Sequence, residues 1–208
     1  MADASTTRRY AARLSPDERR PQLLDAALEV IVERGYAGAT LDVIAERAGV
    51  TKPVIYAAFA DRDAFLAALL DREEARTLGT VTAALPPLDA AAGDRAGLRS
   101  VIAQGVASLL RAIAAEPAPW RLIFSESDAT PEPVRRRIAR DRDVVHAGLR
   151  ELVRRGLPVV GREDLDPDLL AHAFFAMVER FARLAADGDP TLDPDAAGVV
   201  VAAIATGG

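Results

Sequence analysis

The sequence predicts an all-α fold of about nine helices, in which a small three-helix head precedes a larger helical domain. Ala, Leu, Arg and Glu, all good helix formers, dominate the 208 residues. Runs that alternate apolar and polar residues, which would predict strands, do not occur. Ser, Thr, Asp and Pro recur where apolar periods begin, and Gly recurs where several of them end, as is usual at helix boundaries.

The three helices of the head, and the helix that follows it, are marked by capping residues and glycines. Ser15 is followed by Pro16 and two acidic residues, all of which are favoured in the first turn of a helix. The acids are favoured there because the N-terminal end of the helix dipole is positive. Apolar residues then recur at helical spacing as far as Gly35. We expect helices at residues 16–34, 41–48, 52–59 and 62–78, with caps at Ser15, Thr40, Thr51 and Asp61 and stops at Gly35, Gly49 and Gly79.

The rest of the chain contains a turn-rich stretch and five more helical segments. Residues 85–94 are rich in Pro, Asp and Gly and predict a loop. Helices are expected at residues 95–115, 117–125, 131–155, 167–186 and 193–206, several with a proline near the start, where the missing N–H matters least. We divide the chain into a flexible arm at 1–14, a helix-turn-helix domain at 15–60 and a helical domain at 61–208.

Composition limits the classes of function. Half of the residues are hydrophobic, and the absence of cysteine excludes disulfides and thiol chemistry. The net charge is −5, and residues 1–62 carry nine basic and nine acidic side chains, so charge gives little support for a nucleic-acid partner. The N-terminus does not resemble a signal peptide, and no run approaches the roughly 18 uninterrupted apolar residues of a membrane span. We therefore expect a soluble cytoplasmic protein without a membrane partner.

Residues 40–59 (TLDVIAERAGVTKPVIYAAF) predict a helix-turn-helix. Two short helices joined by Ala-Gly-Val should cross steeply, and Gly49 permits a positive φ at the turn. Hydroxyl, basic and free N–H groups suit DNA phosphates, whereas small apolar side chains suit base edges. The alternative is an ordinary bundle with routine threonine caps. The predicted phosphate contacts are Thr40, Thr51, Lys52, Tyr56 and Arg62, and the predicted base contacts are Pro53, Val54 and Ala57.

Residues 40–66 resemble the head of the tetracycline-repressor (TetR) family. The resemblance implies a transcriptional regulator that binds a palindromic double-stranded DNA operator as a homodimer and senses a small-molecule effector through residues 61–208. Ala58 departs from the pattern, which often has His or another large polar residue there, and this leaves the operator sequence open. The residues that carry the resemblance are Thr40, Ala48-Gly49-Val50-Thr51, Lys52, Tyr56, Phe59 and Arg62.

The N-terminal arm and the last two helices suggest further contacts. Arg8, Arg9 and Arg13 suit a DNA minor groove, although a solvated tail fits the same composition. The helix at 167–186 is apolar over so wide an arc that it needs two packing partners, and the last helix is small and apolar all round. A larger monomeric core is the alternative to a dimer. The predicted dimer interface consists of Leu170, Phe174, Met177, Phe181, Leu184, Val200 and Ile204.

An effector pocket has weaker support. Asp141 lies on the apolar stripe of its helix, where a carboxylate needs a partner such as Arg121, Arg137 or a bound effector. Aromatic residues and a histidine nearby would complete a mostly apolar site, although core packing with one internal ion pair explains the same residues. The predicted pocket residues are Trp120, Phe124, Asp141, His146 and Phe175.

The sequence shows no catalytic constellation. His146 and His172 are the only histidines and lie outside any metal-spaced cluster, and neither a Gly-rich phosphate loop nor a nucleophile elbow occurs. We expect no catalytic residue, metal or cofactor. The favoured function is a repressor that an effector releases from its operator. The alternatives are an activator or effector-independent regulator of the same fold, and a helical ligand-binding protein or enzyme.

Overall fold

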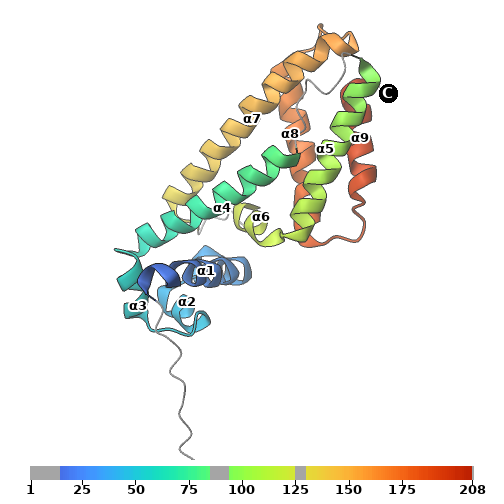
Figure 1. Ribbon diagram of the computed structural model, residues 1–208. Coiled ribbons are helices and arrows are strands. Elements are labelled where there is room, and N and C mark those ends of the chain that lie inside the picture. Colours follow the sequence, from blue (N-terminus) through green and yellow to red (C-terminus); the bar gives the residue numbers. More distant parts are fainter. Residues whose placement is uncertain (1–14, 85–93, 125–129, 208) are drawn as a thin grey trace, which may run out of the picture.

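The computed structural model describes residues 15–84, 94–124 and 130–207, and every regular element within these ranges is a helix (Figure 1). The arm at 1–14 and residues 85–93 of the expected loop lie outside the described residues. The helices within the described ranges are α1 (Pro16–Gly38), α2 (Leu41–Arg47), α3 (Lys52–Ala58), α4 (Arg62–Ala84), α5 (Arg95–Ala115), α6 (Pro117–Phe124), α7 (Glu132–Val160), α8 (Pro167–Asp187) and α9 (Pro194–Thr206).

Helix α1 begins and breaks where the sequence predicts. The Ser15 hydroxyl accepts a hydrogen bond from the Glu18 N–H, and the Glu18 carboxylate accepts one from the Ser15 N–H, so the two residues form a capping box. Gly35 has φ 69° and ψ 174°, which interrupts the helical backbone before Gly38. The buried face of α1, including Ala27, Val30 and Ile31, forms the centre of the head.

Helices α2 and α3 complete the head. Ile44 and Ala45 from α2 and Ile55 from α3 are buried in the same core as α1. Phe59, directly after α3, packs edge-on against Phe65 of α4 with ring centroids 4.8 Å apart. This core continues into α6 and α7, so the head is packed against the larger domain as well as joined to it by α4.

Two helix ends differ from the prediction. Helix α4 continues through Gly79 to Ala84: Gly79 does not adopt a positive φ, and the Thr80 and Thr82 hydroxyls donate to carbonyls one turn earlier. Helix α7 runs five residues beyond the expected end at 155 and stops at Gly161, which has φ 69°. In both cases the extra turns bury apolar side chains, such as Ala84 and Val160, that the local pattern did not reveal.

Helix α5 is the central helix of the larger domain. By length and composition it is apolar enough to cross a membrane, but here it packs against α9, α8 and α4. Figure 1 shows α8, α5 and α9 side by side, with α7 crossing at an angle. Leu110 and Ile113 of α5 are buried against Ala182, Ala185 and other small residues of α8 and α9. Packing within the domain therefore covers part of the apolar surface of α5, and 28% of its most apolar 18-residue stretch is buried.

Candidate nucleic-acid interface

Helix α3 has one buried face and one exposed face. Ile55 and Ala58 point into the head, whereas Pro53 and Ala57 are exposed and the Tyr56 side chain is 49% accessible. Three of the predicted contacts therefore lie on a face that is free to meet DNA. Val54 is half-buried. Ala58, at the position where the sequence departs from the TetR pattern, is buried, so its side chain contributes to the core of the head.

The turn between α2 and α3 has the predicted glycine geometry. Gly49 has φ 65°, and the Val50 N–H donates to the Ala45 carbonyl at 2.9 Å, which closes the end of α2. The Thr40 hydroxyl accepts from the Val43 N–H at 3.3 Å and caps α2 as expected. The cap at Thr51 is different, because this residue has extended backbone geometry but its side chain makes no capping hydrogen bond. The exposed Thr51 hydroxyl is therefore not engaged by its own helix.

The two basic side chains predicted at this surface have different surroundings. Lys52, at the start of α3, donates from Nζ to Oδ2 of Asp42 on α2 at 3.0 Å. This hydrogen bond raises the pKa of Lys52 above its usual value, and Tyr56 contributes in the same direction. Arg62, at the start of α4, is exposed. Sequence reasoning missed the Asp42 contact, because the pair forms only when α2 and α3 cross.

Two further arginines hold the head together. The Arg20 guanidinium donates to the Ala58 carbonyl at the end of α3 and lies 4.2 Å from the centre of the Phe59 ring. Arg47 at the end of α2 donates to both Glu29 and Glu33 of α1. These contacts join residues 14 to 38 positions apart, and no local sequence pattern predicts them.

The predicted pocket residues form two separate groups. Trp120 and Phe124 of α6 lie with ring centroids 6.3 Å apart, and Arg183 stacks over the Phe124 ring. His146 of α7 lies 6.2 Å from Phe175 of α8. Among the described residues no ring contact joins the two groups. The five residues stay a prediction as a binding site.

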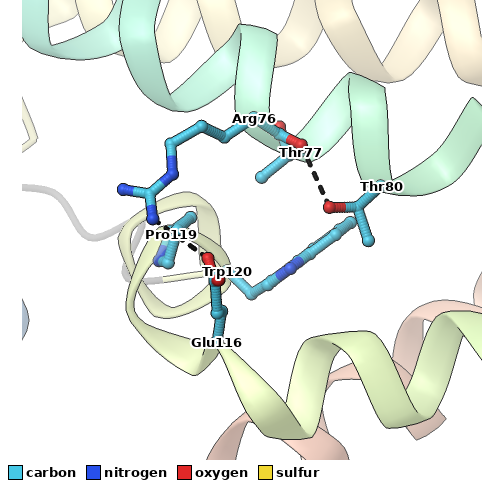
Figure 2. Close-up of a pocket in the computed structure, with 6 residues that line it drawn as sticks. All are labelled: Arg76, Thr77, Thr80, Glu116, Pro119 and Trp120. Carbon is cyan, nitrogen blue, oxygen red and sulfur yellow. Dashed lines mark hydrogen bonds and ion pairs between the residues drawn. The ribbon is translucent and has the colours of Figure 1, made fainter.

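A small cavity lies beside Trp120. Figure 2 shows it between α4 and the start of α6, with Arg76 and Thr80 on one side and Glu116 and Trp120 on the other. Its volume is about 10 Å³, which is room for about one water molecule. Arg76 and Glu116 form an ion pair of 3.0 Å at its rim. An organic effector therefore needs this region to open.

The expected partners of Asp141 are both occupied elsewhere. Arg121 donates from Nε to the Ala186 carbonyl at the end of α8, and Arg137 forms ion pairs with Asp71 and Glu74 of α4. The contact of Asp141 is instead with Arg140, at 3.6 Å. Partial burial, followed by repulsion from Glu74, raises the pKa of the Asp141 carboxyl above its usual value.

The predicted dimer residues are mostly accessible in a single chain. Val200 and Ile204 of α9 are exposed, and Leu170, Phe174, Met177 and Leu184 of α8 are half-buried. Phe181 packs against the core around Leu110, so part of its ring belongs to its own chain. Leu169 and Val199, which the sequence did not single out, are also exposed on these helices. The dimer interface itself stays a prediction.

Comparison with known families places both parts of the chain. Residues 23–69 match the family described as "Bacterial regulatory proteins, tetR family". Residues 99–188 match the domain described as "Tetracyclin repressor-like, C-terminal domain". Together the two matches cover more than half of the chain, in the order head and then larger domain. The chain belongs to the TetR family.

Curated TetR-family relatives match over parts of their length. The transcriptional activator FasR of Mycolicibacterium smegmatis is 40% identical over 125 residues, which are 60% of this chain and 53% of FasR. The transcriptional regulator BetI of Burkholderia thailandensis is 41% identical over 87 residues, which are 41% of this chain and 43% of BetI. The chain thus spans about half the length of the curated relatives that it matches.

Solved structures share the fold over nearly the whole chain. A TetR-like transcriptional regulator from Rhodococcus sp. RHA1 superposes with a TM-score of 0.68 at 24% identity, covering 93% of this chain and 96% of the other. The regulator FadR from Bacillus subtilis in complex with stearoyl-CoA superposes with a TM-score of 0.64 at 21% identity, covering 89% and 97%. The all-α arrangement of head and larger domain is therefore that of TetR-family regulators.

Proposed function

We propose that this chain is a sequence-specific DNA-binding transcriptional regulator, located in the cytoplasm, whose hold on its operator depends on a small molecule. The observation that carries the proposal is the exposed face of α3, set on a packed three-helix head. Tyr56, Pro53 and Ala57 on that face are free to enter a major groove, and Lys52 and Arg62 flank them for phosphate contact. No catalytic role is proposed.

The regulator acts as a homodimer on an operator with dyad symmetry. Exposed apolar side chains on α8 and α9, among them Leu169, Val199, Val200 and Ile204, are unfavourable in water and are suited to a second copy. Sedimentation at micromolar concentration should give a mass of two chains. Val200→Glu combined with Ile204→Glu should give monomers and weaken operator binding, because both heads are needed for two half-sites.

The structure offers a route from the larger domain to the head through α4. Glu73 is buried, with its side chain 2% accessible, and it pairs with Arg72 at 2.6 Å and Arg76 at 3.4 Å. Arg72 also donates to the Pro21 carbonyl and to Asp25 of α1. Arg76 reaches Glu116 beside the small cavity. We propose that opening this cavity moves α4 and, through Arg72, the first helix of the head.

An acyl thioester is the first effector class to test. FadR from Bacillus subtilis is known in complex with stearoyl-CoA, and we extend that ligand class to this chain as a proposal. The apolar side chains of α5, α6 and α8 suit an acyl chain, and the many arginines of α7 suit the phosphates of coenzyme A. Acyl-CoAs of increasing chain length should raise the melting temperature saturably, with free coenzyme A as the control.

Release from DNA is the favoured direction of regulation, with activation as the alternative. The similarity to FasR, described as an activator, supports the alternative. Selection of bound duplexes from a randomised library tests DNA binding first. Operator affinity with and without the stabilising acyl-CoA then gives the coupling. A fall in affinity supports release, a rise supports activation, and a ligand that stabilises the protein without changing affinity contradicts the coupling.

A further inference from the structure

An acidic side chain lies within the surface that faces DNA. Asp42 is the second residue of α2, its side chain is 71% accessible, and its Oδ2 lies 3.0 Å from Nζ of Lys52. Lys52 is one of the phosphate contacts proposed above, and Tyr56 lies close enough to influence its pKa. Because Lys52 and Tyr56 are also one turn apart on α3, Asp42, Lys52 and Tyr56 share one patch of the head.

Fold stability explains an acid at this position but not its contact with Lys52: Asp42 lies in the first turn of α2, where a carboxylate stabilises the positive end of the helix without a lysine partner. Ion pairs between exposed side chains contribute little to stability, since water competes for both partners and salt screens them. The Asp42 side chain is exposed and the Lys52 side chain is partly exposed. Arg47, in contrast, donates two hydrogen bonds to Glu33 and also pairs with Glu29, and these contacts tie α2 to α1. The Lys52–Asp42 pair thus differs in both place and geometry from the pairs that tie α2 to α1.

A carboxylate at a DNA-binding surface interacts differently with phosphates and with base edges. It only accepts hydrogen bonds, and phosphate oxygens also only accept, so an unmatched carboxylate repels the backbone. Base edges in the major groove do include donors, namely the amino groups of cytosine and adenine. An acid beside the phosphate-binding lysine therefore penalises sites that present no donor at the matching position, which is a recognised way of achieving specificity.

We propose that Asp42 is a specificity-determining residue for DNA binding, which rests on the function proposed above. On DNA without a matching donor, Asp42 keeps Lys52 paired and repels the backbone. On the operator, Asp42 accepts a hydrogen bond from a cytosine or adenine amino group, and Lys52 becomes available to the neighbouring phosphate. Lys52 then contributes to operator binding but little to binding of unrelated DNA.

The consequence is measurable as a salt dependence. Each phosphate neutralised by a basic side chain steepens the dependence of log K on log salt by about 0.9. Asp42→Asn frees Lys52 on all DNA. Between about 50 and 200 mM salt, affinity of the variant for unrelated DNA should therefore fall by about three- to fourfold more than affinity of the wild type.

The test is a double-mutant cycle on two duplexes with full-length protein. The duplexes are one selected by the wild type from a randomised library and a scrambled sequence of the same composition. The proteins are the wild type, Asp42→Asn, Lys52→Ala, the double variant and Glu46→Gln. Glu46 is an exposed acid on the same helix but outside the Lys52–Asp42 pair, so its neutralisation controls for net charge. All variants alter exposed side chains, and thermal unfolding checks their fold.

Asp42→Asn should bind the scrambled duplex more tightly and with a steeper salt dependence, while operator affinity stays constant or falls. In the double variant, Lys52→Ala should remove the increase in affinity for the scrambled duplex that Asp42→Asn causes. In the wild-type background, Lys52→Ala should change the affinity for the scrambled duplex little. The role of Asp42 is overturned when Asp42→Asn and Glu46→Gln change both duplexes by the same factor, or when Lys52→Ala acts equally in both backgrounds. Failure of the wild type to select any duplex from the library overturns the proposed function as well.

Discussion

Substitution of Gly198 by alanine tests the packing of the larger domain. Gly198 lies on α9 where that helix approaches α5, and an added Cβ would lie 2.3 Å from the carbonyl oxygen of Ala103 and 3.1 Å from its carbonyl carbon. Carbon and oxygen atoms in favourable contact are about 3.3–3.6 Å apart. Because the obstructing atoms are backbone, α9 must move away from α5 by about 1 Å. The movement disturbs the packing of Val201 and Ala202, which are buried and lie one turn after Gly198 on the same face of α9.

The expected size of the effect combines two opposing contributions. Overpacking of a well-packed interface costs about 1–3 kcal/mol, and the upper part of that range applies because no side chain can rotate away. Replacing glycine by alanine within a helix raises the stability by about 1 kcal/mol, because alanine has the higher helix propensity. The net destabilisation of Gly198→Ala is therefore about 1–2 kcal/mol. For a chain of this length the melting temperature should fall by about 2–8 °C.

The matched control is Gly148→Ala on α7. An added Cβ at Gly148 meets no atom within 4 Å, and this glycine does not adopt a positive φ. The control should be stabilised by up to about 1 kcal/mol, because only the helix propensity changes. Urea unfolding followed by circular dichroism, at one fixed protein concentration because the chain is proposed to dimerise, gives both values. Equal stability of the two variants would refute the close approach of α5 and α9.

Three further predictions concern individual side chains. Glu73→Ala should lower the free energy of unfolding in urea by about 3 kcal/mol. Breaking a buried ion pair costs about 3–5 kcal/mol, and the lower value applies because Arg72 and Arg76 are partly exposed. Asp141 has a raised pKa, so the folded state binds more protons and stability falls as pH rises from the unfolded value of about 3.9 through the folded one. Asp141→Asn should remove that fall and exceed the wild type in stability at neutral pH, and a pH series of unfolding curves checks the sign. Tyr56→Phe should raise the operator Kd about fivefold, equivalent to about 1 kcal/mol, when the hydroxyl donates to phosphate, while melting temperature stays unchanged. If the operator Kd of Tyr56→Phe equals that of the wild type, the Tyr56 hydroxyl does not contribute to binding.

Helix starts could be predicted from the sequence because they depend on neighbouring residues. The predicted caps at Ser15, Thr40 and Asp61 satisfy N–H groups within three residues, so the pattern and the structure agree there. Gly35 and Gly49 both have positive φ, as the turns they occupy require. The all-α fold and membership of the TetR family follow from the same local signals, since the helix-turn-helix motif is continuous in sequence.

Helix ends and side-chain partners depended on contacts between distant segments. Gly79 was expected to stop α4, but its backbone does not turn into the left-handed region that commonly ends a helix at glycine, and Thr77 and Ala84 on either side of it are buried. Arg137 was a plausible partner for Asp141, yet the crossing of α4 and α7 brings Asp71 and Glu74 to it instead. The periodicity of the sequence does not show which acid pairs with Arg137, because that depends on how α4 and α7 lie relative to each other.

The pairing of charges reconciles an acidic chain with the proposed binding of DNA. Arg47 of the head and Arg72 of α4 pair with carboxylates of α1, and Lys52 pairs with Asp42, whereas Arg62 at the start of α4 is exposed. These pairs lower the positive potential that this part of the chain presents to the DNA backbone, and attraction to the backbone dominates non-specific binding. Short-range contacts that form only in the correct register, such as those proposed for Tyr56 and the apolar face of α3, then contribute more to the choice of DNA. A single carboxylate beside Lys52 can therefore influence which DNA is bound.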